Sequence, residues 1–223
     1  MESKRRRPRW LALLLAAAVL ACLALLAGPR LWRTSAVRPP DRYAGAIEQV
    51  RSSKDADGDG VDDQTDILQG ALAYVASRPR YKSRYYATGY PDDGHGVCTD
   101  VVAFALRDAG YDLMYLVEED VLSAPEAYDV PSPDAAIDFR RVRNLRVYLE
   151  RHAIPLTTDP SDVGAWQGGD VVVFRDHIGI VSDRRNDRGV PYVIHHEGVW
   201  QAAYEQDILE SRHDLVGHYR ISE

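Results

Sequence analysis

Cysteine is scarce in this sequence, with two residues among 223. Cys22 lies inside an apolar N-terminal run, so Cys98 is the sole cysteine of the rest of the chain. A single cysteine excludes an internal disulfide, the device that holds many small exported domains together. Cys98 is therefore a small buried residue, a reactive thiol or a partner for another chain.

Positive charge is also lacking beyond residue 33, where 20 Lys and Arg stand against 33 Asp and Glu, a net charge of −13. Nucleic-acid-binding domains attract phosphates with an excess of Lys and Arg, so we expect no nucleic-acid partner. The sequence has no internal repeat and no low-complexity segment. Its fractions of 45% hydrophobic and 27% charged residues are typical of a globular domain.

The N-terminus combines a basic flank with an apolar run. Residues 4–9 are basic, and residues 10–28 carry no charge, a length that can just cross a bilayer. We predict a signal anchor or transmembrane segment over 1–33, a linker over 34–42 and a folded domain over 43–223. The basic flank should stay cytoplasmic, which places the domain on the extracytoplasmic side of the cell envelope. A cleaved signal, giving a secreted domain, and a lipoprotein are alternatives, and both also export it.

Helical spacing comes first in the domain and strand patterns follow. Apolar periodicity predicts helices over 43–52, 66–76, 99–109, 113–121 and 142–152. Short β-branched runs bounded by turn residues predict strands over 170–174, 177–182, 192–196 and 215–220. Helices followed by a small antiparallel sheet indicate the α+β class.

Cys98, His177 and His195 form a pattern that fits nucleophilic catalysis. Cys98 stands where a helix begins, and a helix N-terminus or a neighbouring imidazolium lowers a thiol pKa. His177 would act as the base, and His195, on the next strand, would fix its orientation. In strand geometry His177, Gly179 and Val181 share one face. The alternatives are a buried structural cysteine and hydrogen-bonded structural histidines.

Two resemblances support this interpretation. Residues 169–174, 177–181 and 193–195 resemble the NlpC-type cell-wall cysteine peptidases, which place a Gly-Asp-x-Val strand before the base histidine. Residues 96–102, 137–142, 177–183 and 217–220 resemble more closely an uncharacterised bacterial family, the domain of unknown function numbered 1287. This second resemblance covers residues 45 to 222.

The resemblance to the peptidases implies a papain-like α+β fold, with Cys98 as nucleophile, His177 as base and His195 as orienting residue. It also implies a tyrosine ahead of the nucleophile, for which Tyr86 matches, with Tyr85 and Tyr90 as competitors. The peptidases read Asp-Cys-Ser-Gly, whereas this chain has Asp100 two residues after the cysteine, so the pocket beside the thiol should differ.

Two arginines are candidates for substrate binding. Arg140 and Arg141 follow Asp138, and arginine binds carboxylates through two parallel hydrogen bonds. They would hold a carboxylate of the substrate, near Tyr86 and Asp100. The alternative is a structural cluster of ion pairs.

The acidic loop 55–66 has the spacing of a calcium loop. Its expected ligands are Asp55, Asp57, Asp59, Val61, Asp63 and Asp66, with Gly60 at the sharp turn. Asp66 stands where an EF-hand has a bidentate glutamate, so the loop is more similar to thrombospondin-type repeats. Structural Ca²⁺ is one interpretation and a solvated acidic loop is the other; we expect no cofactor for catalysis.

These observations predict an exported, membrane-anchored cysteine hydrolase that cleaves amide bonds, with peptidoglycan peptides as substrate, through a thioester. The alternatives are an acyl or peptidyl transferase that uses the same thiol, and a non-catalytic wall-binding module.

Overall fold

The computed structural model describes residues 9–31, 33–43 and 47–223. The chain divides into two compact units, Met1–Arg33 and Thr34–Glu223. The described part of the first unit is helix α1 (Arg9–Leu31). A search of the described residues finds no helix with the length and apolar character needed to cross a membrane. The transmembrane anchor stays a prediction from the sequence.

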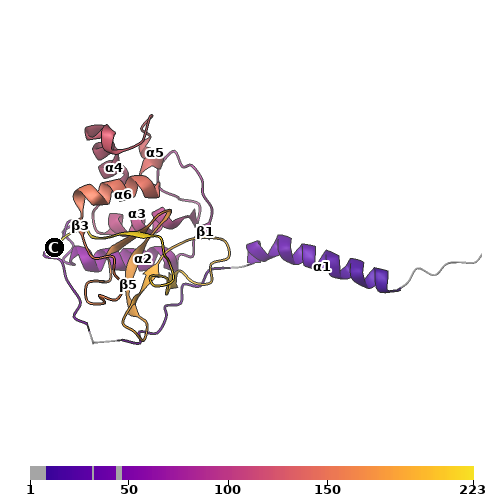
Figure 1. Cartoon of the computed structure of the whole chain (residues 1–223). Coiled ribbons are helices and arrows are strands. Elements are labelled where there is room, and N and C mark those ends of the chain that lie inside the picture. Colours follow the sequence, from indigo (N-terminus) through magenta and orange to yellow (C-terminus); the bar gives the residue numbers. More distant parts are fainter. Residues whose placement is uncertain (1–8, 32, 44–46) are drawn as a thin grey trace, which may run out of the picture. The chain divides into compact units, whose positions relative to one another are not determined.

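The second unit contains helices and a sheet, and its helices precede the strands of the main sheet, as expected from the sequence (Figure 1). Its helices are α2 (Asp63–Ala76), α3 (Cys98–Asp108), α4 (Leu113–Ser123), the 3₁₀ helix η1 (Pro125–Ala127), α5 (Ala135–Asp138) and α6 (Val142–His152). Its strands are β1 (Arg80–Tyr81), β2 (His95–Gly96), β3 (Ile154–Pro155), β4 (Val171–Phe174), β5 (His177–Arg185), β6 (Pro191–Ile194), β7 (Glu205–Gln206) and β8 (Leu215–Arg220).

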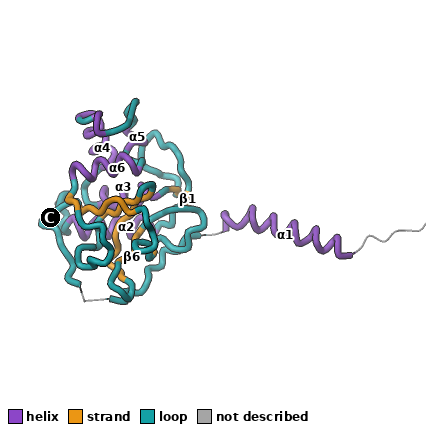
Figure 2. The backbone as a smooth tube through the Cα atoms, in the orientation of Figure 1, coloured by secondary structure: helices purple, strands orange, loops and turns teal. Residues whose placement is uncertain are grey.

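The main sheet has the strand order β3-β8-β4-β5-β6-β7, and every neighbouring pair is antiparallel. Strands β1 and β2 form a separate parallel pair. The predicted α+β class with a small antiparallel sheet is confirmed. Between β6 and β8 the chain is mostly loop, drawn in teal in Figure 2.

Helices α2 and α3 pack against each other, and both contact β5. Val101, Val102 and Ala105 of α3 are fully buried, as expected for a helix that is apolar nearly all round. Gly110 ends this segment in the left-handed conformation, with φ 86°. The packing places the first turn of α3 beside the sheet.

Two predicted features of the N-terminal part of the domain are corrected. Residues 34–42, predicted as a linker, belong to the second unit and are hydrogen-bonded to it, because Ser35 pairs with Ala203 at the sheet edge. Residues 47–52 form no helix; the Val50 N–H donates instead to Gln167 Oε1 (3.2 Å). The rest of the predicted helix, 44–46, lies outside the described residues.

Candidate active site

Cys98 is the first residue of α3, and an aspartate fixes the backbone directly before it. Val97 precedes the helix in an extended conformation, and its N–H donates to Asp100 Oδ2 (2.8 Å). This bond satisfies a backbone donor at the start of α3 and fixes the backbone that places Cys98 at the N-terminus of the helix. Cys98 itself is half-buried.

Asp100 and Arg140, predicted to bind substrate, are instead paired with each other. Arg140 Nε lies 2.6 Å from Asp100 Oδ1 and Nη2 lies 2.9 Å from Oδ2. Both side chains are almost completely buried. The remaining nitrogen of the Arg140 guanidinium, Nη1, donates to the backbone oxygen of Arg84 (2.7 Å). This pair ties the loop ahead of Cys98 to the segment after α5, so the alternative of a structural ion pair is correct for these two residues.

The other two predicted substrate-binding residues lie at the edges of this cluster. Arg141 is half-exposed and stands 3.6 Å from Asp138. Tyr86 donates its hydroxyl hydrogen to Asp93 Oδ1 (2.7 Å), and its ring lies 5.0 Å from the Arg140 guanidinium carbon. Tyr86 therefore packs on the ion pair that supports the helix start.

His177 and His195 are brought into direct contact. His177 opens β5 and His195 follows β6, and their Nε2 and Nδ1 atoms are 2.9 Å apart. Gly179 permits this approach, because a Cβ there would lie 2.7 Å from Val193 Cγ1 and 3.2 Å from His195 Cβ. The space left by this glycine is thus filled by the neighbouring strand.

The thiol lies against the strand that carries His177. Its sulfur accepts from the backbone N–H of Ile178, the residue after His177, and from the N–H groups of Cys98 and Thr99 at the start of α3. Burial outweighs these donors and raises the thiol pKa to about 11. The sequence argument predicts a lowered pKa, so the direction is reversed: the resting group is a neutral thiol.

Both histidines are also neutral at pH 7. Burial lowers the pKa of His177 to about 4, with a further contribution from the positive charge of Arg212. Burial also lowers the pKa of His195 to about 3, followed by the effect of His177 itself. One neutral ring must therefore donate to the other, which leaves His177 with a second nitrogen, Nδ1, outside this bond.

Tyr81 lies near the thiol and was not singled out by the sequence analysis. Tyr81 pairs with Gly96, two residues before the nucleophile candidate. Burial raises the pKa of Tyr81, and the nearby Cys98 adds to this effect. The ring meets His196 edge-on, with centroids 5.3 Å apart. Strands of two residues leave no periodic signal, so the sequence did not point to Tyr81.

A groove opens beside these residues. It has a volume of about 580 Å³, within the range of peptide and small-molecule sites. Tyr81 forms one wall, and the others are built by Gln206 and by residues 197–202, a segment of the loop after His195. Cys98, His177 and His195 do not line the groove, which runs from Tyr81 along the loop that follows the second histidine.

The acidic loop brings together three of its predicted calcium ligands. Oxygens of Asp55, Asp57 and Asp59 all lie within 4.8 Å of one another. Asp63 is turned inward instead, where its Oδ2 accepts from the hydroxyl groups of Tyr111 (2.5 Å) and Ser222 (2.7 Å).

Two other predicted members of this loop have different environments. The Val61 N–H donates to Asp59 Oδ1 (2.8 Å). Burial, followed by the charges of Asp59 and Asp57, raises the pKa of Asp66 to about 6. The cluster thus carries like charges at close range.

Comparison with known proteins shows the family of this chain. Residues 68–221 match the domain of unknown function DUF1287, so the chain belongs to that family. It is also similar to the uncharacterized protein YijF of Escherichia coli (strain K12), with 38% identity over 169 residues, which is 69% of this chain and 80% of YijF. No solved structure matches the chain.

Proposed function

We propose that this chain is an exported cysteine hydrolase with an NlpC-type, papain-like fold that cleaves amide bonds in cell-wall peptides. The observation that carries this proposal is the buried His177–His195 pair, with ring nitrogens 2.9 Å apart; the residue after His177, Ile178, contacts Cys98 through its backbone N–H. A helix N-terminus, a histidine base and an orienting group in contact are the parts that thiol catalysis requires.

The resting groups suit proton transfer during attack rather than a preformed ion pair. With its proton on Nε2, donated to His195, His177 takes the thiol proton at Nδ1 as Cys98 Sγ bonds to the amide carbon. The Cys98 N–H and the Tyr81 hydroxyl stabilise the oxyanion. His177 then protonates the leaving amine as the C–N bond breaks, and water, deprotonated by His177, hydrolyses the thioester.

The test is direct incubation of the full chain with purified peptidoglycan peptides in ¹⁸O-labelled water. A hydrolase yields fragments whose new carboxyl group carries the label. If an added amine appears in the product instead, the transferase alternative holds. If no fragment forms while the peptides still bind, the chain is a wall-binding module, and the hydrolase proposal fails.

The pH profile provides a second test. Since burial lowers the pKa of His177 to about 4, the base stays deprotonated in mild acid. We expect kcat/KM to fall only as the pH drops through about 4, rather than near the ordinary histidine value of about 6.5. The charged and titratable neighbours of this ring are Arg212, Asp214, His195 and His196.

An Arg212→Gln variant serves as the comparison. Arg212 lowers the pKa of His177, so its loss should move the acid limb to higher pH while the limb keeps its shape. An acid limb near 6.5 in both proteins would contradict the assignment of His177 as the base.

Calcium binding by the acidic loop stays a prediction from the sequence. Ca²⁺ would neutralise the converging carboxylates of Asp55, Asp57 and Asp59 and relieve the repulsion that raises the pKa of Asp66. We expect added Ca²⁺ to raise the Tm of the native chain and to leave an Asp57→Asn/Asp59→Asn variant unchanged. Equal melting curves with Ca²⁺ and with a chelator would support the solvated loop.

Export stays a prediction as well, and N-terminal sequencing of the mature protein would distinguish an anchor from a cleaved signal.

A further inference from the structure

Residues 34–38, here called the N-terminal strap, lie along the outer edge of the sheet. The Ser35 N–H donates to the oxygen of Ala202, and the Tyr204 N–H donates to the oxygen of Ser35, each at 2.9 Å. These two bonds make a parallel bridge between Ser35 and Ala203. The strap thus adds one more short strand beyond β7, at the side of the sheet that carries His195.

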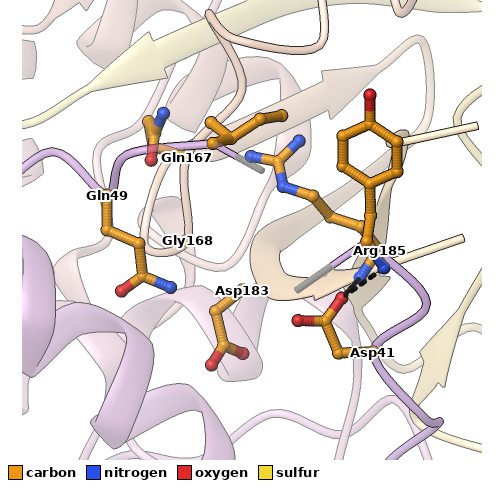
Figure 3. A pocket seen from close by; sticks show the side chains of 8 residues that line it. Asp41, Gln49, Gln167, Gly168, Asp183 and Arg185 are labelled. Carbon is orange, nitrogen blue, oxygen red and sulfur yellow. Dashed lines mark hydrogen bonds between the residues drawn. The ribbon is translucent and has the colours of Figure 1, made fainter. Parts of the chain in front are cut away.

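Ion pairs hold the strap in place after this bridge. Arg38 Nε and Nη2 each lie 3.0 Å from a carboxylate oxygen of Glu205, and Nη2 lies 3.2 Å from Ser182 Oγ. Glu205 is itself paired with Ile194 in the sheet. A few residues on, Asp41 accepts from the Arg185 N–H (3.3 Å), as Figure 3 shows. Residues Arg38 and Asp41 of this N-terminal segment therefore form hydrogen bonds with both β7 and β5.

Residues 197–204, here called the groove loop, lie between His195 and the strap. The loop is closed at its base, where the His195 N–H donates to the oxygen of Tyr204 (2.9 Å). Inside it, Gln201 Nε2 donates to the backbone oxygens of His195 (3.0 Å) and Ala203 (2.9 Å). Gln201 Oε1 accepts from the Glu197 N–H (2.7 Å), which fixes the orientation of the amide.

The same amide lies against the histidine ring, although both of its hydrogens are donated to backbone oxygens. Gln201 Nε2 lies 3.3 Å from His195 Nε2, while the other ring nitrogen, Nδ1, contacts His177. His195 is fully buried, so its ring is held on both sides by protein groups. Gln201 therefore acts on His195 through its backbone oxygen and by packing beside the ring, whose hydrogen-bond partners are the side chains of His177 and Gln206.

We infer that the strap and Gln201 form a positioning device for His195. The strap pairs with the backbone of Ala202 and Tyr204, the loop carries Gln201, and Gln201 holds the backbone of His195, whose ring contacts His177. Without the strap, the groove loop is the open edge of the sheet, where backbone bonds open most readily. The inference deepens the proposed hydrolase and rests on it for its effect on rate.

The test uses the full chain and a pair of substitutions at one position. Ser35→Pro removes the N–H that bonds Ala202, whereas Ser35→Ala keeps both backbone bonds and loses only the hydroxyl, which accepts from the exposed Val37 N–H. Gln201→Ala is the second variant, since it leaves the strap intact. The readouts are the NMR signal of the proton shared by His177 Nε2 and His195 Nδ1, and the separate values of kcat and KM.

We expect Ser35→Ala to match the native chain in both readouts. Ser35→Pro and Gln201→Ala should lose or broaden the shared-proton signal and lower kcat by about 10- to 100-fold, with a smaller change in KM. An unchanged signal in both variants would overturn the inference, even if kcat fell, because the loop would then act on the substrate alone. If the native chain hydrolyses nothing, the NMR readout still decides on the strap, so the two proposals fail separately.

Discussion

Replacement of Cys98 by alanine is expected to lower kcat for cell-wall peptides by about 10⁴-fold or more. In enzymes that act through a covalent intermediate, loss of the nucleophile removes the whole pathway, and only binding and oxyanion stabilisation remain. The measurement is the rate of fragment release, together with the mass of a thioester trapped on the native protein.

The chain supplies its own matched control for this experiment. Cys22 is the second cysteine and is exposed on α1, in the unit that does not contain the site. Cys22→Ala should therefore leave both kcat and the trapped intermediate unchanged. If Cys98→Ala retained activity while Cys22→Ala lost it, the site would have been assigned to the wrong residue.

The second large effect concerns stability. Asp100→Asn should lower the free energy of unfolding by about 3–5 kcal/mol, because it leaves the buried Arg140 guanidinium without its counter-charge. For a chain of this size, such a loss lowers the Tm by about 10 °C. The measurement is denaturant unfolding of the variant beside the native chain.

An exposed ion pair provides the comparison. Asp129 and Arg143 are 2.8 Å apart, but both are well exposed, so Asp129→Asn should cost less than about 1 kcal/mol. A double variant, Asp100→Asn/Arg140→Gln, should lose less than the sum of its single changes, since neither partner is then left charged. Equal losses at the two sites would mean that the Asp100–Arg140 pair does not support the start of α3.

The sequence predicted those features that depend on neighbours along the chain. The apolar run after Cys98 predicted a buried helix, and alternation predicted that His177, Gly179 and Val181 share one face. Each of these inferences uses a period of two or 3.6 residues, which a single segment displays by itself.

The errors arose where distant segments meet. Arg140 was assigned to substrate because its partner, Asp100, is forty residues away and no local pattern links them. Tyr81 was overlooked because a parallel pair of two-residue strands leaves no sequence period. Residues 34–42 were taken for a linker on composition, although Arg38 pairs with Glu205 across the sheet.

By itself, the sequence determined the α+β class of the domain and the order of its helices before the strands of the main sheet, and it singled out Cys98, His177 and His195 as candidates for thiol chemistry. The tertiary structure decided which of the candidate side chains meet and whether they are charged. It brought His177 and His195 to 2.9 Å, paired Arg140 with Asp100, and laid residues 34–38 along the sheet. It also reversed the expected pKa of Cys98, because burial depends on the whole packed domain, whereas a helix N-terminus can be recognised from a few residues.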